Sequence, residues 1–261
     1  MTCRNIEEQA RPRVVIVGLA SCFGCQLQIA NDEPHLLDVL GQIDLCSWQL
    51  ASSAPEPQGD VDVVVVEGAV TTQEGRRCVQ DWRKRAKVLI AIGACATTGG
   101  VPGMASVGLE GRFSQVYDGC APDACGRACD PCSVSSVVKV DYEVRSCPID
   151  TADFVHVLEQ ALHGSNAFVV SDTMCGSCKR NESGCFWRQG KQCLGLVTLA
   201  GCGAKCVNLG RECNGCRGLS PHANLSAARS MAQAMGADVA DFDAALELFN
   251  QTSPMLHKED E

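Results

Sequence analysis

Four cysteines in the first 150 residues follow apolar segments of the chain. Cys22 and Cys25 form a Cys-x2-Cys pair just after an apolar run, and Cys95 and Cys147 come much later in the sequence. One local pair with two distant cysteines is a common way to hold a [4Fe–4S] cluster, in which each iron takes one thiolate. The spacing alone also allows a redox-active dithiol or a structural zinc site.

These alternatives make different predictions. A thioredoxin-like Cys-x2-Cys motif should open a helix, and it would need neither Cys95 nor Cys147. Structural zinc sites usually combine two local ligand pairs, whereas these four cysteines contain one such pair. We therefore favour a cluster and keep both alternatives open.

A second concentration of cysteine lies between residues 174 and 218, which contain eight cysteines and nine glycines. The eight are Cys175, Cys178, Cys185, Cys193, Cys202, Cys206, Cys213 and Cys216. Two sets of four thiolates could hold two more [4Fe–4S] clusters, with zinc as the alternative. The segment has no sustained helical or strand period, so we expect it to lack a normal hydrophobic core and to be organised by bound metal.

Residues 119–132, with the sequence GCAPDACGRACDPC, form a third cysteine-rich stretch. Its cysteines are Cys120, Cys125, Cys129 and Cys132. They could hold an additional cluster or zinc. They could equally be thiols of a surface loop, or ligands completed by a partner chain.

Composition separates metal ligation from disulfide bonding. The chain has 261 residues, of which 19 are cysteine, and its N-terminus has no apolar core of a secretory signal. Disulfide-rich proteins are typically small and secreted, so these cysteines favour metal ligation and a cytoplasmic location. The net charge of −9 without a basic patch argues against nucleic acid as a partner. No apolar run approaches the roughly 18 residues of a membrane span.

The chain alternates between predicted strands and helices as far as residue 165. Continuous apolar runs predict strands at 13–19, 61–70, 87–96 and 135–144, and amphipathic patterns predict helices at 71–86 and 151–164. This alternation predicts an α/β domain over 1–165 with a doubly wound parallel sheet. Residues 166–261 are predicted to form a small, irregular cluster domain that closes with helices at 225–236 and 241–249.

The predicted sheet explains how distant cysteines could meet. Ligands of open parallel sheets bind beyond the carboxyl ends of the strands. Cys22 and Cys25, Cys95 and Cys147 each follow a predicted strand, so all four should reach one edge of the sheet. Glu67 follows another strand and is either a proton-route or interface residue, or a carboxylate that caps the turn after it.

Together, several segments resemble the small, electron-transfer subunits of nickel–iron hydrogenases over nearly the whole chain. The segments are SCFGCQLQ, VEGAVTTQEG, AIGACATTGG, VVKVDYEVRSCPID and CLGLVTLAGCGAKC…GRECNGCRG. The resemblance is strongest to the cytoplasmic branch with NAD(P)-linked hydrogenases and sulfhydrogenase delta subunits. It implies a flavodoxin-like first domain.

The resemblance also implies a ligand for each position of three [4Fe–4S] clusters. The proximal cluster would take Cys22, Cys25, Cys95 and Cys147. The distal cluster would take Cys175, Cys178, Cys185 and Cys193. The medial cluster would take Cys202, Cys213 and Cys216, with Cys206 as the fourth ligand. Cys175 stands where many membrane-linked relatives have histidine.

The implied function is electron relay within a hetero-oligomeric hydrogenase. Hydrogen chemistry would occur in a nickel–iron large subunit, and flavin-containing, diaphorase-type or ferredoxin-like subunits would take the electrons, with NAD(P) as the leading final acceptor. An alternative is a small subunit of a heterodisulfide-reductase-linked or electron-bifurcating hydrogenase. A further alternative is a cluster-bearing carrier of a non-hydrogenase complex, which would not need the C-terminal cysteines.

Overall fold

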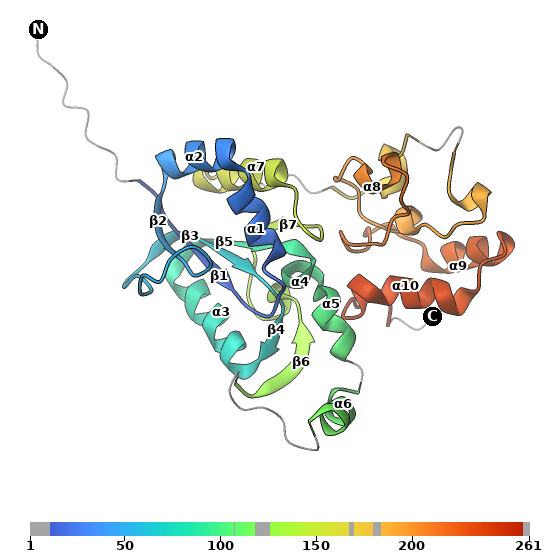
Figure 1. Ribbon diagram of the computed structural model, residues 1–261, viewed down its shortest axis with the longest axis horizontal. Coiled ribbons are helices and arrows are strands. Elements are labelled where there is room, and N and C mark those ends of the chain that lie inside the picture. Colours follow the sequence, from blue (N-terminus) through green and yellow to red (C-terminus); the bar gives the residue numbers. More distant parts are fainter. Residues whose placement is uncertain (1–10, 107, 118–125, 167–169, 180–183, 258–261) are drawn as a thin grey trace, which may run out of the picture.

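The computed structural model describes residues 11–106, 108–117, 126–166, 170–179 and 184–257 (Figure 1). A five-stranded parallel sheet forms the centre of the first part, with the strand order β2-β1-β3-β5-β7. Its strands are β1 (Arg13–Gly18), β2 (Asp44–Trp48), β3 (Val61–Glu67), β5 (Ala86–Ile92) and β7 (Tyr142–Val144). The predicted α/β fold with a parallel sheet is therefore confirmed.

The sheet is covered on both faces, which explains why its central strands are continuous apolar runs. Alternate residues of β3 enter different hydrophobic clusters. Val63 and Val65 pack with the helices α1 and α7, whereas Val64 and Val66 pack with α3 and α4 on the opposite face. Figure 1 shows the two layers of helices on either side of the strands.

The helices of the first part are short. They are α1 (Gly24–Asn31), α2 (Glu33–Gln42), α3 (Gln73–Arg85), α4 (Gly93–Thr98), α5 (Gly100–Gly103), α6 (Leu109–Val116) and α7 (Thr151–Leu162). The predicted helices at 71–86 and 151–164 correspond to α3 and α7. The side chain of Thr72 caps α3 by accepting the N–H of Gly75, and the side chain of Asp150 caps α7 by accepting the N–H of Ala152.

Three predicted strands are too long. The run at 61–70 ends as a strand at Glu67, and Val70 begins a separate short strand. The run at 87–96 ends as a strand at Ile92, because Gly93 takes a φ of 82° and opens α4. Of the run at 135–144, only Tyr142–Val144 joins the sheet, and Val134–Ser136 forms a 3-10 turn instead. A short antiparallel pair, β4 (Val70–Thr72) and β6 (Ala128–Cys132), lies outside the main sheet.

The chain after residue 170 consists of turns and short helices that surround a hydrophobic cluster of their own. Its helices are α8 (Lys205–Asn208), α9 (Leu225–Ala234) and α10 (Val239–Asn250). Trp187, Leu194 and Val197 pack against Phe242 and Leu246 of α10. The expectation that this segment lacks a normal core is therefore wrong, because the closing helices supply an apolar face. Among the described residues, no helix is long and apolar enough to cross a membrane.

Candidate metal centre

The first cysteine pair lies where β1 ends and α1 begins. Cys25 stands in the first turn of α1 and is 7% exposed, whereas Cys22 precedes the helix and is exposed. The connection turns sharply at Phe23, which has a φ of 58°. This is the crevice beside β1 and β3 where the strand order reverses, the usual ligand position in such sheets.

Glu67, at the end of β3, is 1% exposed. It caps α1, which follows the neighbouring strand β1. One carboxylate oxygen accepts the N–H of Cys25 at 3.1 Å, and the other accepts the N–H of Gln26 at 3.2 Å. A carboxylate at a helix N-terminus is favourable because it meets unbonded N–H groups and the positive end of the helix dipole. Glu67 is a cap, but of this distant helix rather than of the turn that follows it.

Cys95 lies in α4, directly after β5. The start of α4 passes so close to the first pair that a Cβ atom on Gly93 would lie 2.5 Å from the Cys25 sulfur. The backbone N–H of Ala94 donates to the carbonyl of Ser146 at 2.8 Å. The segments that carry Cys25, Cys95 and Cys147 are therefore in direct contact.

The electrostatics of these thiols show that the four sequence-predicted positions converge. Burial raises the pKa of the Cys25 thiol well above its ordinary value, and the Glu67 carboxylate, Cys147 and Cys95 raise it further. Burial also raises the pKa of Cys95 to about 11, with further increases from Cys147 and Cys22. Thiols in such surroundings stay protonated near neutral pH, so metal ligation would have to displace their protons.

The helical start at Cys25 bears on the thioredoxin-like alternative. The Cys-x2-Cys motif does open a helix, as that alternative requires. However, a dithiol would leave the convergence of Cys95 and Cys147 on the same pair unexplained. The four thiols together still favour a cluster.

A second group of four cysteines lies in the turns before α8. They are Cys175, Cys178, Cys185 and Cys193. Burial raises the pKa of Cys175 to about 11, and the other three cysteines raise it further. Trp187 holds this loop closed, because its indole N–H donates to the carbonyl of Cys193 at 2.8 Å.

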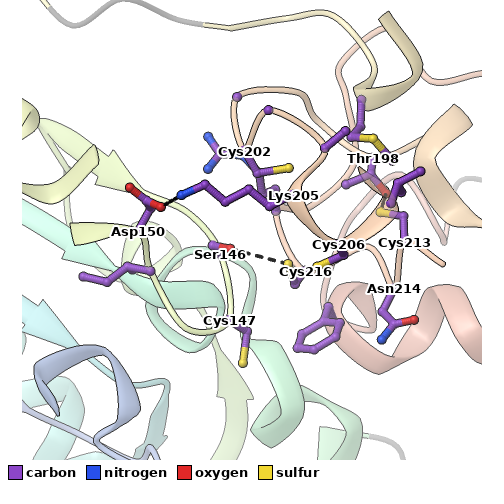
Figure 2. Close-up of a pocket in the computed structure, with 18 of the residues that line it drawn as sticks. Ser146, Cys147, Asp150, Thr198, Cys202, Lys205, Cys206, Cys213, Asn214 and Cys216 are labelled. Atoms are coloured by element: carbon purple, nitrogen blue, oxygen red, sulfur yellow. Dashed lines mark hydrogen bonds and ion pairs between the residues drawn. The ribbon is translucent and has the colours of Figure 1, made fainter. Parts of the chain in front are cut away.

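A third group surrounds a cavity of about 530 Å3 that also contacts Cys147 (Figure 2). Its members are Cys202, Cys206, Cys213 and Cys216. Burial raises the pKa of Cys206, and Cys216 and Cys202 raise it further. Burial likewise raises the pKa of Cys213 to about 12.

The three groups follow one another in space. Cys147 of the first group and Cys216 of the third interact electrostatically, since Cys216 is the largest cause after burial of the raised pKa of Cys147. Cys213 of the third group donates its backbone N–H to the sulfur of Cys193 in the second, at 3.3 Å. The order in space is therefore first, third, second, which differs from their order in the sequence.

The donor chemistry of each group fits an iron–sulfur cluster. Within the described ranges, no three His, Cys, Asp or Glu side chains have the arrangement that binds one metal ion directly. The fit therefore rests on the donors themselves: each group supplies four thiols, one for each iron of a [4Fe–4S] cluster. Backbone N–H groups that donate to Cys25, Cys193 and Cys213 are the kind of second shell such clusters use.

The additional site predicted at residues 120–132 lies only partly in the structure. Cys120 and Cys125 are outside the described residues. Cys129 and Cys132 belong to β6, and Arg76 donates weakly to the Cys132 sulfur at 3.9 Å. A metal site in this segment stays a prediction.

Two residues that join the cysteine groups were not predicted from the sequence. Ser146 and Arg217 each stand beside a predicted ligand, yet neither residue type signals a role in such a site. Arg217 is 8% exposed. Adjacency to a cysteine was the only signal available, and it does not distinguish these residues from other neighbours.

A parallel α/β sheet with four thiols at its ligand-binding edge, followed by eight more thiols in two groups, defines a redox subunit of the iron–sulfur class. Residues 22–161 match the family described as NADH ubiquinone oxidoreductase, 20 Kd subunit. The chain belongs to this family.

Named relatives place the chain with hydrogenase subunits, and solved structures share its fold. It is 34% identical to sulfhydrogenase 2 subunit delta of Pyrococcus furiosus, over 79% of this chain and 86% of that protein. It is 27% identical to a vhu subunit of the F420-non-reducing hydrogenase from Methanocaldococcus jannaschii, over 79% and 81% of the two chains. An NAD+-reducing [NiFe]-hydrogenase chain shares its fold, with a TM-score of 0.53, 24% identity and coverage of 61% and 95%. The resemblance to hydrogenase small subunits is confirmed, and with it membership of an oxidoreductase complex.

Proposed function

We propose that this chain relays electrons within a cytoplasmic nickel–iron hydrogenase, between the active site of a large subunit and a flavin- or NAD(P)-reducing partner, through three [4Fe–4S] clusters. The observation that carries the proposal is the row of three four-cysteine groups, joined at Cys147 and Cys216 and again at Cys213 and Cys193. When bound, such clusters supply one-electron redox chemistry.

Each group has its own place in this proposal. The sheet-edge cysteines would hold the proximal cluster, the cysteines around the cavity the medial cluster, and the group that contains Cys175 and Cys193 the distal cluster. Glu67 would keep Cys25 in place by capping α1, and its buried charge would favour the oxidised state of a nearby cluster. Its position does not require a proton-route role.

Hydrogen chemistry, H2 ⇌ 2H+ + 2e−, is assigned to the partner large subunit. Cys22 and Cys147 are both exposed, so the sheet-edge group has a face that such a partner could cover. Covering that face would exclude water from the group and leave the cavity side as the exit for electrons. The similarity to named hydrogenase subunits supports this arrangement.

The final acceptor is the least constrained part of the proposal. The names of the similar proteins specify a sulfhydrogenase, a hydrogenase that does not reduce F420, and an NAD+-reducing enzyme. NAD(P) remains the leading acceptor by resemblance, with the heterodisulfide-linked or bifurcating complex as the alternative. A non-hydrogenase carrier is less favoured, because the similarity to sulfhydrogenase delta covers 79% of this chain.

The proposal is tested on the complex purified without oxygen together with its bound partners. Hydrogen-dependent reduction of NAD+, NADP+, ferredoxin and an artificial dye would be measured for the unmodified chain and for Cys22→Ser. Cys46→Ser is the matched control, because Cys46 lies in β2, is partly buried and belongs to none of the three groups.

We expect Cys22→Ser to lose hydrogen-dependent reduction of the physiological acceptor and Cys46→Ser to keep it. Full acceptor reduction by the Cys22→Ser complex would contradict the proximal assignment. A complex without any nickel–iron partner would contradict the hydrogenase assignment itself.

A further inference from the structure

Two ligand-bearing segments from distant parts of the chain bind each other through their arginines. Arg217, next to Cys216, donates from Nη1 to the carbonyl of Arg145 at 2.8 Å. Arg145, two residues before Cys147, donates from Nη1 to the carbonyl of Arg217 at 3.2 Å. Each guanidinium therefore holds the backbone of the other segment, and together they form a reciprocal clamp between the first and third cysteine groups.

Arg217 is the more buried half of this clamp. Its side chain is 10% exposed, and its Nε also donates to the carbonyl of Ala200 at 2.9 Å. The carboxylate of Asp153 lies 3.3 Å from Nη1, but that side chain is 40% exposed, so solvent weakens the ion pair. Backbone carbonyls, rather than a buried counter-charge, are what fix this guanidinium in place. A buried charge without such hydrogen bonds would be costly.

The space around both guanidinium groups depends on glycine. A Cβ atom at Gly201 would lie 2.5 Å from Nη2 of Arg217, and one at Gly218 would lie 2.8 Å from Nη1 of Arg145. Both glycines have a positive φ, 114° at Gly201 and 86° at Gly218, and a side chain at either position would also force the nearby guanidinium to shift. The two guanidinium groups thus occupy space that only glycine at these positions leaves open.

Ser146 belongs to the segment that carries Arg145, and its side chain points toward Cys216 in the other segment (Figure 2). Its hydroxyl is 3.6 Å from the sulfur of Cys216, and its carbonyl accepts the N–H of Ala94, beside Cys95. Ser146 has a φ of 149°, which glycine adopts more easily than serine. Glycine would therefore suit this backbone position better, yet the chain has a serine there.

We propose that Arg145 and Arg217 set the separation between the proximal and medial cysteine groups, and that the Ser146 hydroxyl donates a hydrogen bond to the Cys216 sulfur across this junction. All three are positioning residues. The inference rests on the proposed function, in which an electron would cross here: one bound cluster would lose one electron and its neighbour would gain it, with no bond broken. The rate of such a transfer depends steeply on separation, and a hydrogen bond to a ligand sulfur raises the reduction potential.

The clamp is tested with Arg217→Met in the intact complex. Arg229→Met is the matched control, because Arg229 pairs with Asp243 away from the junction. In dithionite-reduced samples we expect Arg217→Met to weaken the magnetic interaction between neighbouring clusters in EPR spectra while the iron content is kept. We also expect faster hydrogen exchange at Ala94 and Leu199, whose N–H groups donate to the carbonyls of Ser146 and Gly218. Arg229→Met should change neither measurement.

The hydrogen bond is tested separately with Ser146→Ala, which leaves both arginines in place. We expect one cluster to shift to a more negative midpoint potential in an EPR-monitored redox titration, with iron content unchanged. Because this variant does not disturb the clamp, it remains informative if Arg217→Met fails to fold.

The outcomes separate this inference from the proposed function. Unmodified protein without clusters would refute the proposed function, and hydrogen exchange would still report on the clamp. Loaded protein in which Arg217→Met leaves magnetic interaction and exchange unchanged would overturn the clamp. An unchanged potential in Ser146→Ala would overturn the hydrogen bond.

Discussion

The cysteines at the sheet edge and those near the C-terminus are held in different ways. The first group lies at the start of α1, in α4 and after β7, and Cys25 alone of its four members belongs to a hydrophobic cluster of the sheet. In the C-terminal part, Cys193 is itself a member of the hydrophobic cluster, and Cys178, Cys185, Cys202 and Cys213 pack against it. One proposed ligand of four enters the core of the sheet, against five of eight in the C-terminal part, so we expect the sheet to depend less on bound metal.

The largest expected effect of this difference follows from removing iron. Anaerobic treatment of the complex with a chelator should abolish amide protection across residues 174–218, because the proposed ligands are part of that core and metal binding would be coupled to its folding. The amides of β3 and β5 should stay protected. Hydrogen exchange with mass spectrometry measures both regions in one sample.

The opposite outcome would have a clear meaning. Persistent protection of residues 174–218 without iron would show that Trp187, Leu194 and the closing helices suffice to hold the C-terminal part. It would also remove the contrast between the two regions.

A cavity in the sheet core should have a smaller effect, confined to the first part. Leu89 is completely buried between β3 and the helices on one face. Leu89→Ala should lower the free energy of unfolding by about 2–5 kcal/mol, through lost burial and a residual cavity. Urea unfolding followed by circular dichroism measures this loss, and iron content should not change. Loss of C-terminal iron in this variant would show that the two parts are not independent.

Alkaline pH should distinguish the thiols of the two regions after iron is removed. Burial, then Cys147 and Cys22, raise the pKa of Cys95 to about 11 from a reference value of 9.0. A raised thiol pKa gives stability that is fully present below the unfolded value of 9.0 and is lost as pH rises through about 11.

The measurement is thiolate absorbance in the ultraviolet as pH is raised on the iron-free chain. Cys25, Cys95 and Cys147 should ionise late, and stability of the first part should fall over the same range. The C-terminal thiols should ionise near the value of unfolded chains, if that part has lost its structure. A single transition for all thiols near that value would contradict the comparison.

The smallest effect is expected at the surface of the sheet. Lys87 lies 2.7 Å from Asp62 and holds the pKa of that carboxyl below its ordinary value. Lys87→Met should raise the pKa of Asp62, as measured by NMR titration, with no measurable change in the unfolding midpoint, because exposed ion pairs contribute little. A large loss of stability would show that this edge of the sheet matters more than its exposure suggests.

Sequence patterns predicted the strands that are buried on both faces of the sheet. The β-branched runs of β1 and β3 are apolar on both faces, so their strand structure and the parallel sheet could be inferred. The strand β2 and the helices α1 and α2 were missed, since Asp44–Trp48 has no apolar run and α1 begins inside the cysteine motif. The division of the chain into domains at residue 165 stays a prediction.

The convergence of the cysteines on the candidate site could be predicted from the sequence, but the order of the three groups in space and the residues that support them could not. Parallel strands deliver Cys25, Cys95 and Cys147 to one edge, which is a consequence of topology. The proximity of Cys147 to Cys216 and the clamp by Arg217 depend on how segments distant in the sequence pack together, and local sequence does not specify that. The assignment of individual cysteines to clusters also stays a proposal.

Counting iron and acid-labile sulfide per chain in the anaerobically purified complex, with EPR of the reduced sample, tests the central claim most directly. Three [4Fe–4S] clusters predict about twelve irons and about twelve sulfides per chain. About sixteen would add a cluster at residues 120–132 to the same account. About four irons would contradict the assignment of the eight C-terminal cysteines, and a colourless, zinc-only protein would contradict the electron-transfer function itself.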